Sequence, residues 1–314
     1  MKISRALIGF LLLTLLYLGL LVWLESKNQV FYVLPSLLAT LPALIVIALA
    51  SYTVRYARWR WLLGRAGHRI PVASGALAYV AGFAFTATPG KAGELVRIRY
   101  YAPIGVPAAR VVAAFVYERV FDLIAVLLLA SCALFTLDRL DIFFFAFGFV
   151  LLLTLVIVLL ALNPRWFERT AVRLNTLKLP LLARACTTLR DGLAACRVWA
   201  RPLEVSVSFA SGLLAWLITA LAFVYLLVQL GITVPTLAAI AIYPLAMLAG
   251  AASLLPGGIG STELAIVALL SAWSVPLAAA TLAAVGIRIA SLWFAVLCGI
   301  ACLAVLEWQM RTST

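Results

Sequence analysis

Long apolar runs separated by short basic segments dominate the chain. Runs such as Leu34–Tyr52 and Val205–Leu230 are long enough to cross a bilayer, whose hydrocarbon core needs roughly 20 apolar residues per helix. The pattern predicts an all-α polytopic membrane protein with about six full transmembrane helices. The expected spans are Ala6–Trp23, Leu34–Tyr52, Val111–Leu137, Ile142–Leu162, Val205–Leu230 and Leu277–Leu306.

Two further apolar segments, Val72–Tyr101 and Leu237–Ala272, are broken by proline and glycine at Pro89–Gly93 and Pro256–Gly260. Each break reads Pro-Gly-x-x-Gly with a glutamate close behind it. Paired interruptions in two halves of a chain are typical of transporters built from inverted repeats. We therefore expect two oppositely oriented re-entrant helical hairpins. The alternatives are two full crossings for the first segment, or two helix breaks that recur by chance.

The domain organisation follows from these segments. We expect a single integral membrane domain without a separate soluble domain, because no stretch is polar enough to form one. It divides into a first half, 1–137, with hairpin 72–101; a middle part, 138–203, with one span and a basic cytoplasmic surface loop; and a second half, 204–314, with hairpin 237–272.

The charged residues set the expected orientation. The chain carries 24 Lys and Arg against 11 Asp and Glu, and the arginines gather between spans, as in Arg55–Arg69 and Arg165–Arg201. Cytoplasmic loops of membrane proteins are enriched in this way, so we expect no nucleic-acid partner. We expect a multi-pass protein of the plasma (bacterial inner) membrane with both termini cytoplasmic. In Leu181–Trp199 leucines interleave with arginines, which predicts a helix on the cytoplasmic surface.

Several enzyme classes lack their motifs here. The five cysteines form no Cys-x-x-Cys pair, and the only histidine is His68. No Walker loop and no Gly-x-Ser-x-Gly sequence is present. We therefore expect no metal, no cofactor, no catalytic residue and no direct ATP hydrolysis.

Ionisable residues inside the expected spans are the first candidate site. Such groups cost about 3 kcal/mol to insert, so they pair with one another or mark a pathway. Glu118 and Asp122 share one helix face, whereas Arg119 is expected to point about 100° away. The two carboxylates could bind a cation, share a proton or clamp an arginine such as Arg288. Equally, they could form an ion-pair network that only locks helices together.

The hairpin tips are the second candidate site. A helix is expected to restart after the glycines at Gly93-Glu94 and at Ser261-Thr262-Glu263, where free N–H groups could hold a phosphate. Alternatively, the glutamates simply cap these helices. The candidate substrate-binding residues are Lys91, Gly93, Glu94, Arg97, Glu118, Arg119, Asp122, Pro256, Gly257, Gly258, Gly260, Glu263 and Arg288.

Three stretches of the sequence resemble the signature motifs of the lysylphosphatidylglycerol synthase transmembrane family. They are the run from Thr88 to Arg97 (TPGKAGELVR), the Glu118-Arg119-x-x-Asp122 motif, and the run from Leu255 to Glu263 (LPGGIGSTE). The resemblance extends over nearly the whole chain. Because the chain ends at Thr314, directly after the last expected span, we expect no soluble aminoacyl-transferase domain and no lysyl-lipid synthesis by this chain alone.

The resemblance implies lipid translocation. We expect a flippase, not an enzyme, that moves a phosphate-bearing phospholipid, polyprenyl-linked or hopanoid-type lipid between leaflets. Its partners would be membrane lipids, including an anionic or polyprenyl-phosphate substrate, and the oligomeric state stays open. The alternatives are an integral-membrane transferase with Glu118 or Asp122 as general base, and a non-catalytic scaffold of a lipid-synthesis complex.

Overall fold

The structure is a computed structural model that describes residues 34–135, 148, 152, 164–176 and 180–312. All regular elements in these ranges are helical. The expected spans Ala6–Trp23 and Ile142–Leu162 lie outside the described residues, apart from positions 148 and 152. Three described helices are long and apolar enough to cross a membrane: Pro35–Arg65, Pro202–Gln229 and Leu277–Thr312. The all-helical class is confirmed, whereas the number of full spans stays a prediction.

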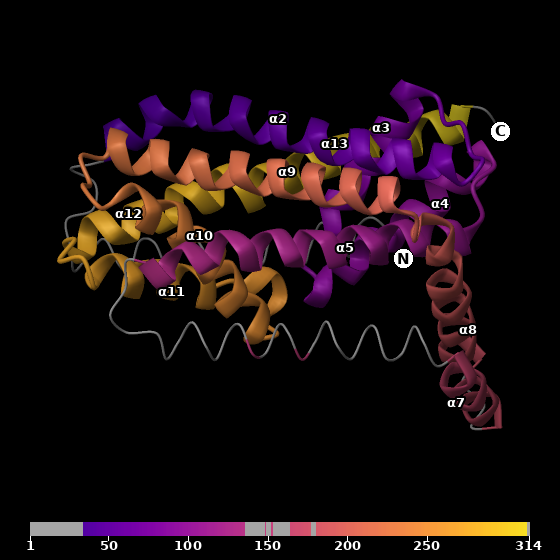
Figure 1. The fold of residues 1–314 in the computed structure, drawn as a ribbon. Coiled ribbons are helices and arrows are strands. Elements are labelled where there is room, and N and C mark those ends of the chain that lie inside the picture. Colours follow the sequence, from indigo (N-terminus) through magenta and orange to yellow (C-terminus); the bar gives the residue numbers. More distant parts are fainter. Residues whose placement is uncertain (1–33, 136–147, 149–151, 153–163, 177–179, 313–314) are drawn as a thin grey trace.

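Three long helices run side by side along the molecule: α2 (Leu34–Arg65), α5 (Ala108–Ala130) and α9 (Pro202–Gln229) (Figure 1). A fourth long element consists of α12 (Leu277–Arg288), one turn of π-helix and α13 (Phe294–Thr312). Two apolar cores fill the bundle, one centred on Phe223 and Leu226 and the other on Trp59 and Tyr79. Buried charged residues on these helices, among them Arg58, Asp122 and Arg288, form a polar interior within the bundle.

The second expected span is longer than predicted. The prediction that Leu34–Tyr52 gives way to an arginine-rich loop is wrong, because α2 continues without a break to Arg65. Arg58 is 2% exposed and Trp59 is fully buried, so this part of α2 packs inside the bundle. The helix persists because these arginines find carboxylates on α5 and do not need water.

The first hairpin turns back on itself. It comprises α3 (Val72–Ala81), the 3-10 helices η2 (Gly82–Phe85) and η3 (Pro89–Val96), and α4 (Arg97–Tyr101). Its two arms meet near their open ends, where the Tyr101 hydroxyl donates a 2.7 Å hydrogen bond to the carbonyl oxygen of Gly75. The helix expected to restart at Gly93-Glu94 begins at Arg97 instead, since Pro89–Val96 winds as a 3-10 helix.

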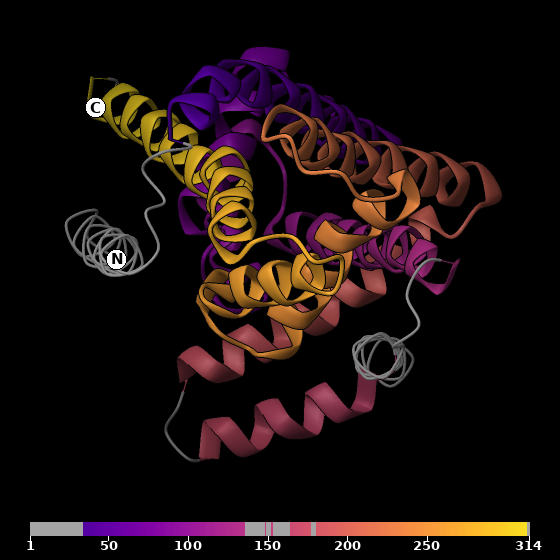
Figure 2. The same cartoon turned by 90° about the vertical axis from the view of Figure 1, so that its left-hand side faces the viewer.

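The second hairpin approaches from the opposite end of the bundle (Figure 1). It comprises α10 (Thr236–Ala252), the short 3-10 turn η7 (Pro256–Gly258) and α11 (Ser261–Ser271). Here the predicted restart is confirmed, because α11 begins at Ser261 directly after the glycines. Seen along the bundle axis, α10, α11 and α12 lie side by side on one side of the molecule (Figure 2).

The two hairpin tips touch in the middle of the bundle. A side chain at Gly257 would lie only 3.3 Å from the Cα of Ala87, and Gly257 has a φ of +62°. On the flank, α13 passes so close to η2 that a Cβ at Gly299 would overlap the backbone of Ala84. Glycine is therefore needed both where the tips meet and where α13 supports the first of them.

A pair of helices crosses one end of the bundle. The helices α7 (Pro164–Thr176) and α8 (Pro180–Ala195) lie across the long axis, and α8 packs against α5 (Figure 1). The helix expected over Leu181–Trp199 is confirmed, although it ends in a 3-10 turn, η6 (Cys196–Trp199). The sequence reasoning did not predict α7.

Candidate functional site

A cavity of about 370 Å³ lies between the hairpin tips. Its wall comes from α2, α5, α9, α12 and both hairpins, so segments from both halves of the chain build it. Apolar residues such as Trp216 and Leu292 line one part, whereas basic and hydroxyl side chains line another. The charged lining residues are Arg55, Lys91, Glu94, Arg119 and Arg288.

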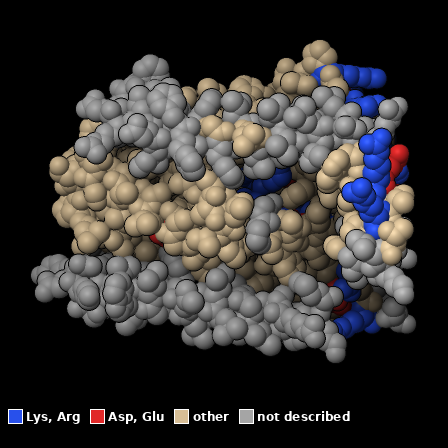
Figure 3. All heavy atoms as spheres, turned by 90° about the horizontal axis from the view of Figure 1, so that it is seen from below, with Lys and Arg blue, Asp and Glu red and all other residues tan. Residues whose placement is uncertain are grey.

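The surface shows basic groups inside the bundle as well as at one end. Lys and Arg atoms are visible in a hollow half-way along the bundle, where the described residues around them are mostly uncharged (Figure 3). Other basic atoms gather at the end where α7 and α8 lie (Figure 3). The basic groups therefore form two separate populations, one at the end and one inside.

Arg288 ties α12 to the second hairpin tip. Its Nη2 donates a 2.6 Å hydrogen bond to the carbonyl oxygen of Gly257, and its Nε donates a 2.9 Å hydrogen bond to Glu263 Oε1. The other oxygen of Glu263 accepts a 2.8 Å hydrogen bond from the Gly260 amide, which confirms the capping interpretation for this glutamate. Of the alternatives open for Glu118 and Asp122, the clamp on Arg288 is wrong, because Arg288 pairs with Glu263.

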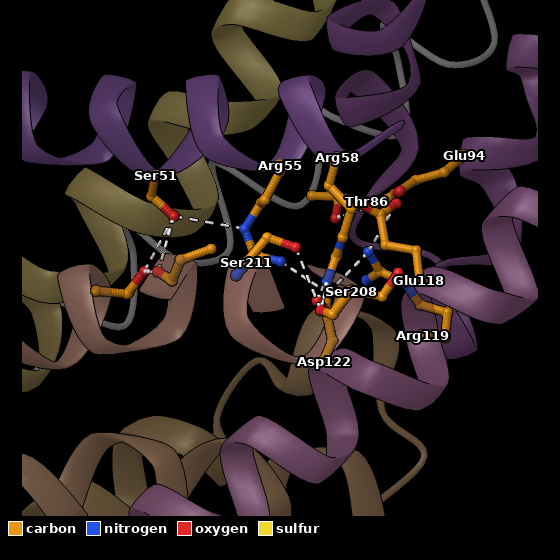
Figure 4. A network of polar contacts seen from close by, with 12 residues as sticks. Ser51, Arg55, Arg58, Thr86, Glu94, Glu118, Arg119, Asp122, Ser208 and Ser211 are labelled. Atoms are coloured by element: carbon orange, nitrogen blue, oxygen red, sulfur yellow. Dashed lines mark hydrogen bonds and ion pairs between the residues drawn. The ribbon is translucent and has the colours of Figure 1, made fainter. Parts of the chain in front are cut away.

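Asp122 is instead the centre of an arginine cluster beside the cavity (Figure 4). Its carboxylate lies 2.7 Å from Arg55 Nη1, 2.7 Å from Arg58 Nη2 and 3.0 Å from Arg119 Nη2. The prediction that Arg119 points away from the carboxylate face is wrong as well. Its long side chain reaches along the helix to Asp122, about one turn further on.

Glu118 is buried one turn before Asp122. It accepts a 2.7 Å hydrogen bond from the Tyr79 hydroxyl and a 2.9 Å hydrogen bond from Arg58 Nη2. The guanidinium carbon of Arg97 stacks 4.0 Å from the centre of the Tyr79 ring, and Arg97 Nη1 lies 3.8 Å from Glu118. This layer joins α2, α3, α4 and α5 by buried contacts without facing the cavity.

Glu94 links this buried layer to the cavity. Its Oε1 accepts a 2.9 Å hydrogen bond from the Thr86 hydroxyl, and its Oε2 lies 3.0 Å from Arg97 Nη2. Both Glu94 and Thr86 line the cavity. The alternative that Glu94 caps a helix is wrong, because it lies inside the 3-10 helix and pairs with side chains.

Lys91 differs from the cavity arginines. It lines the cavity, yet its amine forms no ion pair with a residue in the described ranges. Its backbone has a φ of +56°, which is strained for a residue with a side chain. The Pro-Gly-Lys-Ala-Gly tip therefore holds one cation in an unusual backbone conformation at the cavity wall.

The structure divides the thirteen predicted site residues into two groups. One group lines the cavity: Lys91, Glu94, Arg119, Gly257, Gly258 and Arg288. The other group does not line it: Gly93, Arg97, Glu118, Asp122, Pro256, Gly260 and Glu263.

Sequence reasoning missed Arg55 and Arg58 because both were assigned to a cytoplasmic loop. A signal was present: Ser51, Arg55 and Arg58 follow at helical spacing and so share one face of a continued helix. It also missed Thr86, a buried hydroxyl residue on the cavity wall, because a single threonine in an apolar segment carries no pattern that would identify it. Thr262, which is also buried in the cavity wall, belongs to the segment expected to restart the helix but was not among the candidate residues.

Comparison with known proteins places this arrangement in a family. The model of the lysylphosphatidylglycerol synthase TM region matches residues 6–299. The chain belongs to this family. No curated protein and no solved structure matches it. Membership supports a multi-pass membrane protein with a lipid-related role. The matched range includes both hairpins and every residue that lines the cavity.

Proposed function

We propose that this member of the lysylphosphatidylglycerol synthase TM family is a lipid transporter of the plasma membrane, with both termini cytoplasmic. It would move a phosphate-bearing lipid between leaflets. The observation that carries the proposal is the cavity between the two hairpin tips, whose wall holds four basic side chains and one carboxylate. A lipid headgroup bearing phosphate fits such a wall by charge, and the apolar lining suits the start of its acyl or prenyl chains.

The opposed hairpins support a transport route. We propose that they enter the membrane from opposite faces and form an inverted repeat, so that their tips meet near mid-membrane. Tip contacts such as Gly257 against Ala87 would then form the barrier that a lipid headgroup must pass between the two leaflets. Rocking of the halves about this contact would open the cavity to one side at a time.

The competing transferase reading is less well supported. It requires Glu118 or Asp122 as a free general base at the cavity wall, yet neither residue lines the cavity. Both carboxylates are also engaged by arginines within 3.0 Å. A carboxylate held by such partners is a poor proton acceptor.

The test is translocation of fluorescent lipids in proteoliposomes that contain this protein alone. Phosphatidylglycerol, its aminoacylated form and a polyprenyl phosphate are compared, with Arg288→Ala as the control variant. Headgroup-dependent flipping that Arg288→Ala abolishes supports the transporter. If folded protein flips none of these lipids, the transferase and the scaffold become the better supported hypotheses.

A further inference from the structure

The polar interior has more positive than negative groups. In the described part of the chain, six basic side chains lie in or directly behind the cavity wall, against four carboxylates. The basic residues are Arg55, Arg58, Lys91, Arg97, Arg119 and Arg288, and the carboxylates are Glu94, Glu118, Asp122 and Glu263. The polar interior therefore carries two more positive than negative groups, because several arginines share the same carboxylates.

The excess of positive charge lies on the side of the polar interior that lines the cavity. Of the four carboxylates only Glu94 lines it, whereas Glu118, Asp122 and Glu263 hold their arginines from behind. Lys91 adds a cation at the wall that has no carboxylate partner among the described residues. Uncompensated charge in a low-dielectric interior is costly, so the cavity favours an anion.

These observations deepen the proposed function by naming a charge class of substrate. We propose that the cavity selects a lipid with a terminal phosphomonoester, whose charge of about −1.5 to −2 offsets the surplus of two. A phosphodiester such as phosphatidylglycerol carries one negative charge and leaves a surplus. An aminoacylated headgroup adds a cation and increases it. Lys91 is the specificity-determining residue, because it contributes the cation without a carboxylate partner.

The first experiment compares fluorescent phosphatidic acid with fluorescent phosphatidylglycerol of the same acyl chains in proteoliposomes. We expect phosphatidic acid to move about tenfold faster, as a difference of one favourable charge contact allows. Lys91→Gln removes most of this preference, whereas Lys91→Arg retains it. Arg99→Gln is the matched control, since Arg99 is exposed and pairs with Glu307 away from the cavity.

The outcomes separate this inference from the proposed function. Equal rates for the two lipids, or an unchanged preference in Lys91→Gln, overturn the monoester selectivity while leaving transport intact. If neither of these two lipids moves, and the aminoacylated lipid and the polyprenyl phosphate of the first test do not move either, the transporter itself fails. Thermal unfolding of the purified protein then decides the site: short-chain phosphatidic acid should stabilise wild type more than Lys91→Gln. Equal stabilisation by inorganic phosphate assigns the site to free phosphate, and no stabilisation by either overturns it.

Discussion

Arg288 Nη2 donates a hydrogen bond of 2.6 Å to the carbonyl oxygen of Gly257, a main-chain atom in the tip of the second hairpin. The same guanidinium pairs with Glu263 and lines the cavity, so one side chain touches the tip, its supporting carboxylate and the substrate space. A residue in this position can hold the tip in place, bind substrate, or do both. A double mutant of Arg288 and Glu263 distinguishes these roles.

Arg288→Ala should lower lipid translocation by about thirtyfold or more, because loss of a buried charged contact costs 2–5 kcal/mol. If the role is only structural, Glu263→Gln in the same chain should restore much of the rate, since it removes the carboxylate left unpaired. If Arg288 binds substrate, the double mutant stays inactive although its thermal stability recovers. Translocation and unfolding midpoints, measured on the same preparations, separate the two results.

The contact between the tips predicts a position-specific effect of adding one methyl group. Gly257→Ala and Gly231→Ala both place a side chain at positive φ, +62° and +68°, at a cost of about 1–2 kcal/mol each. Only at Gly257 does the new Cβ meet the facing tip, 3.3 Å from Ala87. Stability should therefore fall similarly in both variants, whereas translocation should fall only in Gly257→Ala. Equal transport by the two variants would remove the tip contact from the mechanism.

The larger Gly257→Val and Gly93→Val changes probe the two tips differently. At Gly93 a Cβ would lie 2.6 Å from the Phe85 Cβ and 2.9 Å from Thr88, so the substitution disturbs packing inside the first tip. We expect membrane insertion to persist in both variants and transport to be lost in both. Fractionation with a transport assay checks this, and normal transport in either variant contradicts it.

The tips could be predicted from sequence because proline and glycine leave a visible break in an apolar run. The two Pro-Gly-x-x-Gly segments do lie together, although neither their contact nor their different local helices could be inferred. The side-chain pairing could not be predicted, since it depends on how α2, α5 and α12 pack. Arg288 pairs with Glu263 and not with Asp122. Arg55 and Arg58, which were expected in a loop, lie in the interior and pair with Asp122. Arginines at the end of an apolar run are compatible with a cytoplasmic loop and equally with a continued helix whose arginines pair with buried carboxylates.

Asp122 holds three arginines, so its neutralisation should be strongly destabilising. Asp122→Asn leaves Arg55, Arg58 and Arg119 with one shared carboxylate fewer, and breaking a buried ion pair typically costs about 3–5 kcal/mol. Asp191→Asn is the matched control, because Asp191 pairs with Arg190 at an exposed site on α8. The unfolding midpoint in detergent should drop clearly for the first variant and stay unchanged for the second. Similar midpoints in the two variants would show that the cluster is not a structural centre.

Opposite entry of the hairpins predicts which loops share a side of the membrane. In a cysteine-free background, Arg69→Cys and Pro103→Cys at the open end of the first hairpin should react with a membrane-impermeant maleimide from the cytoplasmic side. Thr233→Cys and Ser271→Cys, at the open end of the second, should react only from the other side; all four positions are exposed. The native Cys196 should react slowly even in wild type, because burial raises its pKa to about 12 and keeps the thiol protonated. Labelling of Arg69→Cys and Pro103→Cys from opposite sides would mean that the first segment crosses the membrane, and the inverted-repeat mechanism would fail with it.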